Sequence, residues 1–108
     1  MQKSDLTQLQ RSVTETYRNF VVGEVNESCL RMSVFTGQYK WHRHPESDEL
    51  FMVLEGALTI EFRHQAPVVL GPGEILTVPK GVAHRTSARE RTVNLCFEYT
   101  ASTTVFEE

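Results

Sequence analysis

Hydrophobic and polar residues alternate along much of the chain with a period of two. Residues 30–35 and 58–62 are the clearest examples, and this period is typical of a strand with two different faces. Short apolar runs separated by Gly, Pro, Ser and Asp give about eight expected strands, at 20–23, 30–35, 49–54, 58–62, 68–70, 75–78, from 85, and 93–99. A polar turn is expected at 88–91 and a polar tail at 101–108. The pattern predicts an all-β sandwich or barrel.

The beginning of the chain departs from this period. Leu6, Leu9 and Val13 have helical spacing, and either Ser4 or Asp5 can cap a short N-terminal helix. Residues 13–17 also alternate as in a strand, so the sequence leaves the end of this helix open.

The strand expected at 49–54 is apolar on both faces. Phe51 and Val53 share one face, whereas Leu50, Met52 and Leu54 share the other. One face is expected to fill the barrel interior, and the second face to be buried by another layer or another subunit. We therefore expect a homodimer.

Candidate metal chemistry is concentrated in two segments. His42 and His44 are two residues apart and share a strand face, Glu49 follows a Pro-containing turn, and His84 follows a Pro-x-Gly turn. A lone His-x-His pair is more often two partly exposed polar residues, and the second segment is what favours a metal. Three imidazoles and one carboxylate suit one divalent ion of Mn, Fe, Ni, Co, Cu or Zn and disfavour Ca or Mg.

These segments resemble the two motifs of the cupin superfamily. The first motif is matched by Gly37, His42, His44, Glu49 and Gly56, and the second by Gly73, Pro79, Gly81 and His84. The spacing from Gly37 to His42 is one residue short, and Ala88 replaces the final Asn of the pattern. The resemblance implies a double-stranded β-helix, or jelly-roll barrel, in a small single-domain prokaryotic cupin. Residues 1–108 would form one domain with a two-motif core at about 37–99.

Three residues are candidates for a substrate pocket. Phe51 and Val53 are in phase with Glu49, and Lys40 is in phase with His42, where it would bind an anionic substrate or stay exposed. Tyr39 and Trp41 alternate with Lys40 and His42, so their side chains are expected to face away from the histidines. His64 is expected in a solvated turn.

Charge and hydropathy argue against several classes of protein. A net charge of −3 and a pI near 5.8 argue against nucleic acid as a partner. The sequence has no apolar run of the ~20 residues that a membrane span needs, and its polar start does not resemble a signal peptide. Cys29 and Cys96 are expected to be buried free thiols in a reducing compartment, so a cytoplasmic protein is expected.

Three function classes stay open. The favoured one is a metal-dependent enzyme acting on a small molecule, of dioxygenase, decarboxylase or isomerase type, as the cupin resemblance implies. The others are a small-molecule-binding or sensor protein with a non-catalytic metal site, and a structural metal site. Metal affinity is expected to fall below the imidazole pKa of about 6 to 7, because the ligands must lose their protons. Neither the metal nor the substrate follows from the spacing.

Overall fold

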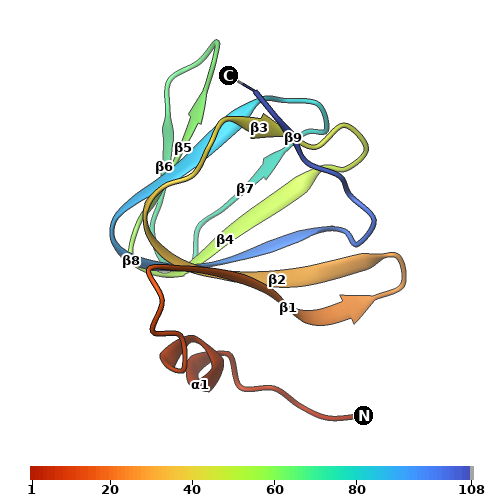
Figure 1. The fold of residues 1–108 in the computed structure, drawn as a ribbon, viewed down its shortest axis with the longest axis vertical. Coiled ribbons are helices and arrows are strands. Elements are labelled where there is room, and N and C mark those ends of the chain that lie inside the picture. Colours follow the sequence, from red (N-terminus) through yellow and green to blue (C-terminus); the bar gives the residue numbers. More distant parts are fainter. Residues whose placement is uncertain (108) are drawn as a thin grey trace.

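The computed structural model describes residues 1–107, so Glu108, the last residue of the expected polar tail, lies outside them. Within residues 1–107 there are one helix and nine strands, and every strand pairing is antiparallel. Figure 1 shows the sheet curling around a central space, the jelly-roll form of an all-β barrel. The elements are α1 (Leu6–Arg11), β1 (Tyr17–Val25), β2 (Ser28–Gln38), β3 (His42–Arg43), β4 (Glu49–Glu55), β5 (Leu58–Phe62), β6 (Val68–Leu70), β7 (Ile75–Val78), β8 (His84–Tyr99) and β9 (Val105–Phe106).

Strand β8 holds the barrel together. It pairs with β2, β3, β4 and β5, while β1 extends the sheet beyond β2, β7 beyond β4 and β6 beyond β5. The turn expected at 88–91 is wrong, because β8 runs without a break for 16 residues. The polar residues 89–91 form a bulge there: β2 has one residue between its partners of Ala88 and Thr92, whereas β8 has three. The exposed bulge bends β8, so that one strand can pair with strands on both sides of the barrel.

The C-terminal residues are also more ordered than the expectation of a polar tail. Val105 and Phe106 form β9, which pairs with Arg43 and His42 of β3. The tail expected at 101–108 is therefore wrong over these residues, and the segment closes the edge beside β3. Its two-residue strand is too short to produce a visible alternation in the sequence.

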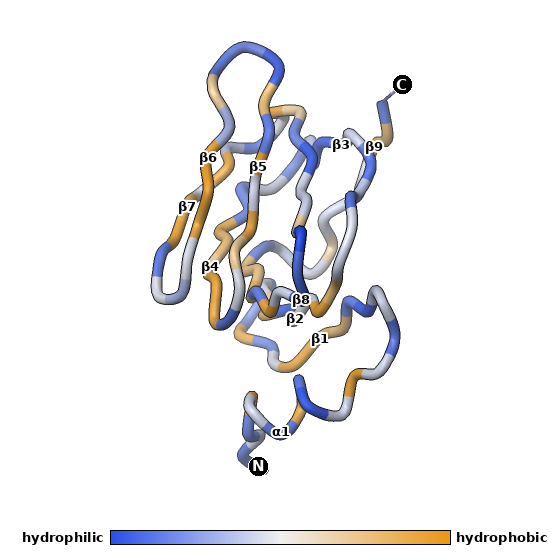
Figure 2. Tube along the Cα trace, turned by 90° about the vertical axis from the view of Figure 1, so that its left-hand side faces the viewer, coloured by the Kyte–Doolittle hydropathy of each residue, from blue (hydrophilic) through white to orange (hydrophobic). Residues whose placement is uncertain are grey.

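Two apolar clusters lie on opposite faces of the sheet. The inner cluster fills one end of the barrel with residues that include Val53, Leu58, Ile60, Leu70 and Val78. The outer cluster joins Met32, Val34, Val93 and Leu95 to partly buried residues of α1, β1 and β4. Figure 2 shows hydrophobic colouring along much of β4, β6 and β7.

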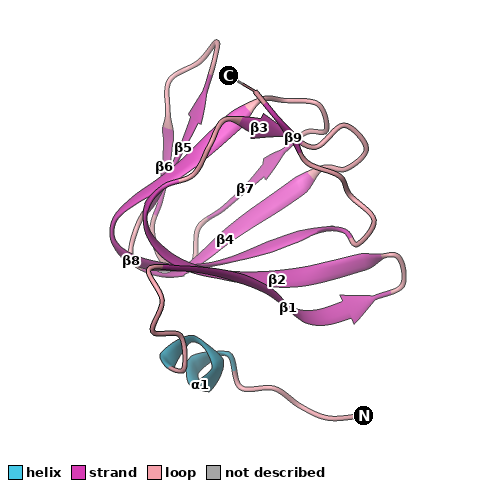
Figure 3. Cartoon of the chain, viewed as in Figure 1, coloured by secondary structure: helices cyan, strands magenta, loops and turns pink. Residues whose placement is uncertain are grey.

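Helix α1 lies against the outside of the barrel, beneath β1 and β2 (Figure 3). Asp5 is its N-cap and accepts hydrogen bonds from two backbone N–H groups of the first turn, which decides between the two expected caps. Arg91 donates to the Gln10 side chain and to its carbonyl oxygen at 2.7 and 2.5 Å, and Gln10 donates to Glu55 at 3.2 Å. The chain's own helix thus covers part of the apolar outer face that includes Met52.

Candidate metal centre and its cavity

The structure brings His42, His44, Glu49 and His84 together. Each offers one ligand atom, these atoms all lie within 4.8 Å of one another, and all four residues are buried. His42 lies directly opposite His84 where β3 pairs with β8, and Glu49 begins β4. The four side chains come from three segments, with His42 and His44 on the same one, so the barrel must close before they meet.

The two motif segments are joined by backbone hydrogen bonds. The N–H of Gly81 donates to the carbonyl of His44 at 2.9 Å, and the N–H of Lys80 donates to Oδ1 of Asp48 at 2.9 Å. Gly81 has φ +81°, a conformation that favours glycine in the Pro-Lys-Gly turn. These contacts fix the turn that leads into His84.

Two histidines are oriented by the same local contact. Nδ1 of His42 lies 2.8 Å from the carbonyl oxygen of Lys40, and Nδ1 of His84 lies 2.9 Å from that of Val82. Because a carbonyl only accepts, Nδ1 carries the proton in both rings. Nε2 is then the nitrogen that faces the cluster, which is the second-shell arrangement common to histidines that bind metal.

His44 is oriented by the C-terminal segment instead. Its Nδ1 donates to the carbonyl oxygen of Thr103 at 3.0 Å, and Thr103 in turn donates to the exposed carboxylate of Glu46 through its backbone N–H and its hydroxyl. Farther along, Phe106 lies against the ring of His42 at 6.2 Å. Sequence reasoning missed this contribution, because Thr103 is 59 residues from the histidine it holds.

Glu49 provides the charge of the cluster. Its Oε1 lies 3.1 Å from Nε2 of His44 and 3.3 Å from Nε2 of His84. Burial raises the pKa of Glu49, but the hydrogen bonds and charges of the two histidines outweigh it and lower that pKa overall. Burial also lowers the pKa of His44, but Glu49 raises it to about 9, whereas burial lowers the pKa of His42 to about 4. Without a metal, the charge of Glu49 thus favours the protonated form of His44.

This donor set fits a divalent transition metal. Nε2 of His44 is buried and has no hydrogen-bond partner of acceptable geometry among residues 1–107, although it faces the carboxylate. Three imidazole nitrogens that can each be neutral and one carboxylate oxygen converge on one point. The cluster can therefore hold a metal ion of the nitrogen- and oxygen-binding class.

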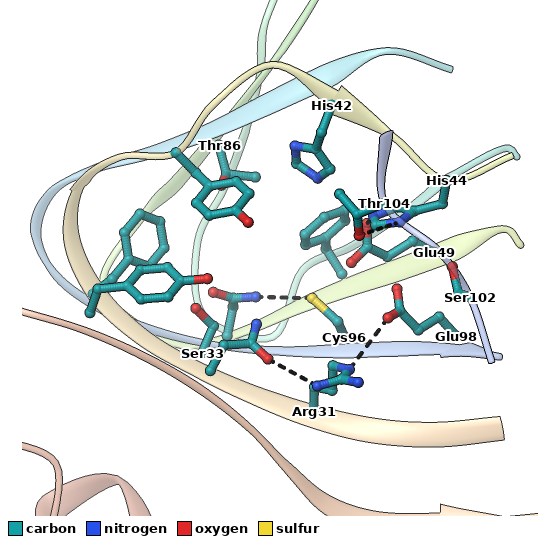
Figure 4. A pocket seen from close by; sticks show the side chains of 16 residues that line it. Arg31, Ser33, His42, His44, Glu49, Thr86, Cys96, Glu98, Ser102 and Thr104 are labelled. Carbon is teal, nitrogen blue, oxygen red and sulfur yellow. Dashed lines mark hydrogen bonds and ion pairs between the residues drawn. The ribbon is translucent and has the colours of Figure 1, made fainter. Parts of the chain in front are cut away.

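A cavity of about 320 Å³ opens beside the cluster. His42, His44 and Glu49 line it, whereas His84 lies behind them with 1% of its surface exposed. Figure 4 looks into this cavity, with His42, His44 and Glu49 on one side of it. Its size is that of a small-molecule site.

The structure places the three pocket candidates differently. Phe51 lines the cavity and packs edge-on against His84, with ring centroids 5.9 Å apart. Val53 lies deeper in the inner apolar cluster and does not line this cavity. Lys40 also does not line it: this side chain is exposed, with Nζ 5.8 Å from the ring centroid of Phe106.

The expectation that Tyr39 faces away from the histidines is wrong. Tyr39 lines the cavity, packs edge-on against His42 with centroids 5.1 Å apart, and stacks on Tyr17 at 5.7 Å. Residues 39–41 lie outside any strand, so the alternation of strand faces does not continue through them. The guanidinium groups of Arg63 and Arg85 both contact the ring of Trp41, at 3.9 and 4.9 Å from its centroid.

Sequence reasoning also missed a polar floor, formed by inward-facing side chains of β2 and β8. The floor consists of Arg31, Ser33, Asn94, Cys96 and Glu98, all of which line the cavity. The available signal was the alternation of polar with apolar residues along both strands, at positions where a barrel interior is normally apolar.

Charges on this floor are paired. Nε of Arg31 lies 3.4 Å from Oε1 of Glu98. Burial and the nearby charge of Glu49 raise the pKa of Glu98 to about 7. The thiol of Cys96 is buried, which raises its pKa well above the ordinary value and keeps it protonated.

Residues 32–97 match the family model described as Cupin domain. This chain is a cupin. The cupin is 48% identical over 104 residues to the uncharacterised protein YdbB of Bacillus subtilis (strain 168), covering 96% of this chain and 92% of that protein. The crystal structure of a cupin-2 domain containing protein from Shewanella frigidimarina superposes with a TM-score of 0.83 at 30% identity, covering 89% of this chain and 93% of the other.

A more distant neighbour of the cupin is the DMSP lyase DddQ from Ruegeria pomeroyi. It has a TM-score of 0.74 at 21% identity, and covers 97% of this chain but 60% of the lyase. At this identity the likeness shows a shared fold only.

Proposed function

We propose that this cupin is a metal-dependent enzyme that acts on a small molecule. The observation that carries the proposal is the cavity of about 320 Å³, which ends on three of the four candidate ligands. A purely structural metal site would not need an open space beside the ion. The cavity instead gives a small molecule access to the centre.

His42, His44, Glu49 and His84 would hold one divalent ion of Mn, Fe, Ni, Co, Cu or Zn. Such an ion supplies Lewis-acid polarisation of a bound oxygen, or redox chemistry when it is iron, manganese or copper. The three backbone carbonyls behind the rings keep each Nε2 aimed at the centre. The proton on His44 must leave when the ion binds, because a protonated nitrogen cannot be a ligand.

Other residues of the cavity would exclude water and position the substrate. Phe51 gives the centre an apolar wall, and Tyr39 covers His42 from the side. The reaction types that we propose are those of a dioxygenase, decarboxylase or isomerase. A fold neighbour named as a lyase is compatible with such chemistry in this barrel, although its identity of 21% supports the fold alone.

The alternative is a small-molecule-binding or sensor cupin with a non-catalytic metal site. One observation favours it: apart from Glu49 and Glu98, no lining residue of the described chain offers a carboxyl group, and Arg31 is ion-paired with Glu98. Burial also raises the pKa of Tyr17 and Tyr39, so neither phenol is a ready base. A binding protein needs no such base.

Metal content and turnover test this proposal together. Protein purified without a metal-affinity tag is analysed for metals, reloaded with each candidate ion, and incubated with small organic acids while oxygen uptake and product masses are followed. We expect one ion per chain and turnover that a His42→Ala variant lacks. Stoichiometric metal without turnover would favour the sensor, and failure to bind any of the six ions would overturn both functions.

We also propose a homodimer that uses the outer face near the ends of β1 and β8. Val25 and Tyr99 both lie opposite Ser28 on this face and are 61% and 54% exposed, and Phe97 beside them is 43% exposed. Burial of such a patch by a second copy is favourable. Sedimentation at micromolar concentration tests this, and a monomer would contradict it.

The remaining proposals concern organisation and location. Within residues 1–107, the structure contains no helix with the length and apolar character of a membrane span. We propose a cytoplasmic protein with residues 1–108 as one cupin domain and no nucleic-acid partner, which the net charge of −3 supports.

A further inference from the structure

The polar floor of the cavity contains two buried hydrogen-bond acceptors without a partner. Oδ1 of Asn94 and Oε2 of Glu98 have no hydrogen-bond partner among residues 1–107, and the two residues are only 2% and 9% exposed. Buried polar atoms are normally paired, because leaving them unpaired costs stability. Both residues line the cavity, so these two atoms are candidates to bind a ligand there, which needs a small rotation of each side chain because neither atom has accessible surface of its own.

The remaining atoms of both side chains are already engaged within the floor. Nδ2 of Asn94 donates to Sγ of Cys96 at 3.4 Å, and Oε1 of Glu98 lies 3.4 Å from Nε of Arg31. The free atoms are an amide oxygen and a carboxylate oxygen, which both accept. A complementary ligand must present O–H or N–H donors to them.

The cations of the cavity do not favour an anionic group at the floor. Arg31 is the only Lys or Arg among the lining residues of the described chain, and it is shared between Glu98 and Oδ1 of Asn19 at 3.5 Å. A carboxylate placed there would face the Glu98 carboxylate and find no unengaged cation. A hydroxyl or an ammonium group avoids this repulsion.

The candidate metal centre, where Glu49 lies next to Glu98, has the reverse preference. His42, His44 and Glu49 lie on one side in Figure 4, and Arg31, Ser33, Cys96 and Glu98 lie below them. Three neutral imidazoles and one carboxylate leave a bound divalent ion with a net positive charge, which attracts an anionic oxygen. The cavity is thus anion-seeking at the metal centre and donor-seeking at the floor beside it.

We propose that Asn94 and Glu98 form a specificity subsite for a small carboxylic acid that carries a hydroxyl or primary ammonium group at its far end. The carboxylate of this ligand faces the metal centre, and its donor group binds Oδ1 of Asn94 and Oε2 of Glu98. This inference rests on the proposed metal site and adds the substrate class. The two donor chemistries, alcohol and amine, are distinguished by the experiment.

The test uses matched ligands on the Mn²⁺-loaded protein. For chains of three to five carbons, ω-hydroxy and ω-amino carboxylates are compared with carboxylates that end in a methyl group of similar size. Binding is followed by the loss of the water-proton relaxation enhancement as each ligand displaces water at the ion. We expect one of the donor series to bind at least about tenfold more tightly than its methyl analogue at one chain length.

Two variants locate the effect. Asn94→Leu and Glu98→Gln should each reduce that preference to about twofold or less, when donor and methyl ligands are compared on the same variant at saturating Mn²⁺. Glu98→Gln should weaken an amine more than an alcohol, because it removes the negative charge. Glu61→Gln is the matched control, since Glu61 is ion-paired with Arg85 but does not line this cavity.

The failures are distinguishable. Failure of the unmodified protein to bind Mn²⁺ or any of the other candidate ions would overturn the metal-centred function and this inference with it. Normal Mn²⁺ binding with equal affinity for all three ligand series would overturn the subsite alone. A donor preference that survives in both floor variants would also overturn it, because the preference would then arise elsewhere.

Discussion

The two ends of the barrel interior are built on the same strands but have opposite character. Along one face of β4, Glu49 faces the candidate metal centre, Phe51 lines the cavity, and Val53 is fully buried in the apolar cluster. The dry end continues through residues such as Leu58 and Ile60, both with no exposed surface. The open end instead collects polar side chains whose hydrogen bonds are incomplete.

This difference separates stability from chemistry. Apolar burial at the dry end supplies a rigid support, and close packing transmits that rigidity along the strands to the ligands. At the open end, candidate metal ligands and buried polar groups take the place of apolar side chains. This end can therefore bind a metal and a ligand, but it contributes less to the free energy of unfolding. Substitutions at the two ends should consequently have different effects.

The largest expected effect is the loss of the metal when one ligand is removed. His84→Ala should weaken metal binding by about 1,000-fold or more, because a nitrogen ligand is lost and the remaining three cannot enclose the ion. Isothermal titration with Zn²⁺ or Mn²⁺ measures this.

The control for this variant is His64→Ala, which removes an exposed histidine of the β5–β6 turn. Its metal affinity should stay unchanged. Equal affinities for the two variants would mean that the imidazole of His84 is not a ligand.

A smaller effect is expected at the dry end. Leu58→Ala should lower the free energy of unfolding by about 3 kcal/mol, through lost burial and the cavity left behind, and should change metal affinity by about twofold at most. Urea unfolding of the metal-free protein measures the stability change. Val69→Ala, on the neighbouring strand and 61% exposed, should cost less than about 0.5 kcal/mol. A large loss of metal affinity in Leu58→Ala with unchanged stability would contradict the separation of the two ends.

The smallest expected effect is a dependence of stability on pH at the open end. The pKa of His44 in the folded, metal-free protein is raised to about 9. Its contribution is therefore complete below the unfolded pKa of about 6.5 and is lost as the pH rises through 9. Between pH 7 and 9 the free energy of unfolding should fall by at most about 1.4 kcal/mol per pH unit.

A His44→Gln variant should show a flatter profile over the same range, measured by urea unfolding at fixed ionic strength. Metal-loaded protein should also show a flatter profile, since His44 is then deprotonated at both ends of the range. An identical alkaline slope in the variant would assign the effect to another group.

Sequence reasoning worked best where structure is local. Strands 58–62 and 68–70 have the expected bounds, because alternation and flanking turns both act within a few residues. The polar run at 88–91 was misjudged as a turn, because the pairing of β8 before and after it carries one strand through the bulge.

The same limit applies to the centre and its surroundings. The four candidate ligands could be proposed from their spacing within two motifs. The contact of Thr103 with His44 could not be proposed from the sequence, because the fold alone brings together two residues that are 59 positions apart. Tyr39 was misplaced because it follows the end of β2, where the alternation of strand faces stops. Val53 was expected in the pocket because alternation shows which side chains point into a barrel, but not how far each lies from its open end.

The position of Trp41 has a practical consequence. It is the only tryptophan of the chain, it precedes His42, and its ring contacts two arginines. Intrinsic fluorescence therefore arises from one fluorophore next to a candidate ligand, and Arg85 on its face is the neighbour of a second one, His84. Occupancy of the centre should be readable as a change in emission, without a dye or an engineered label.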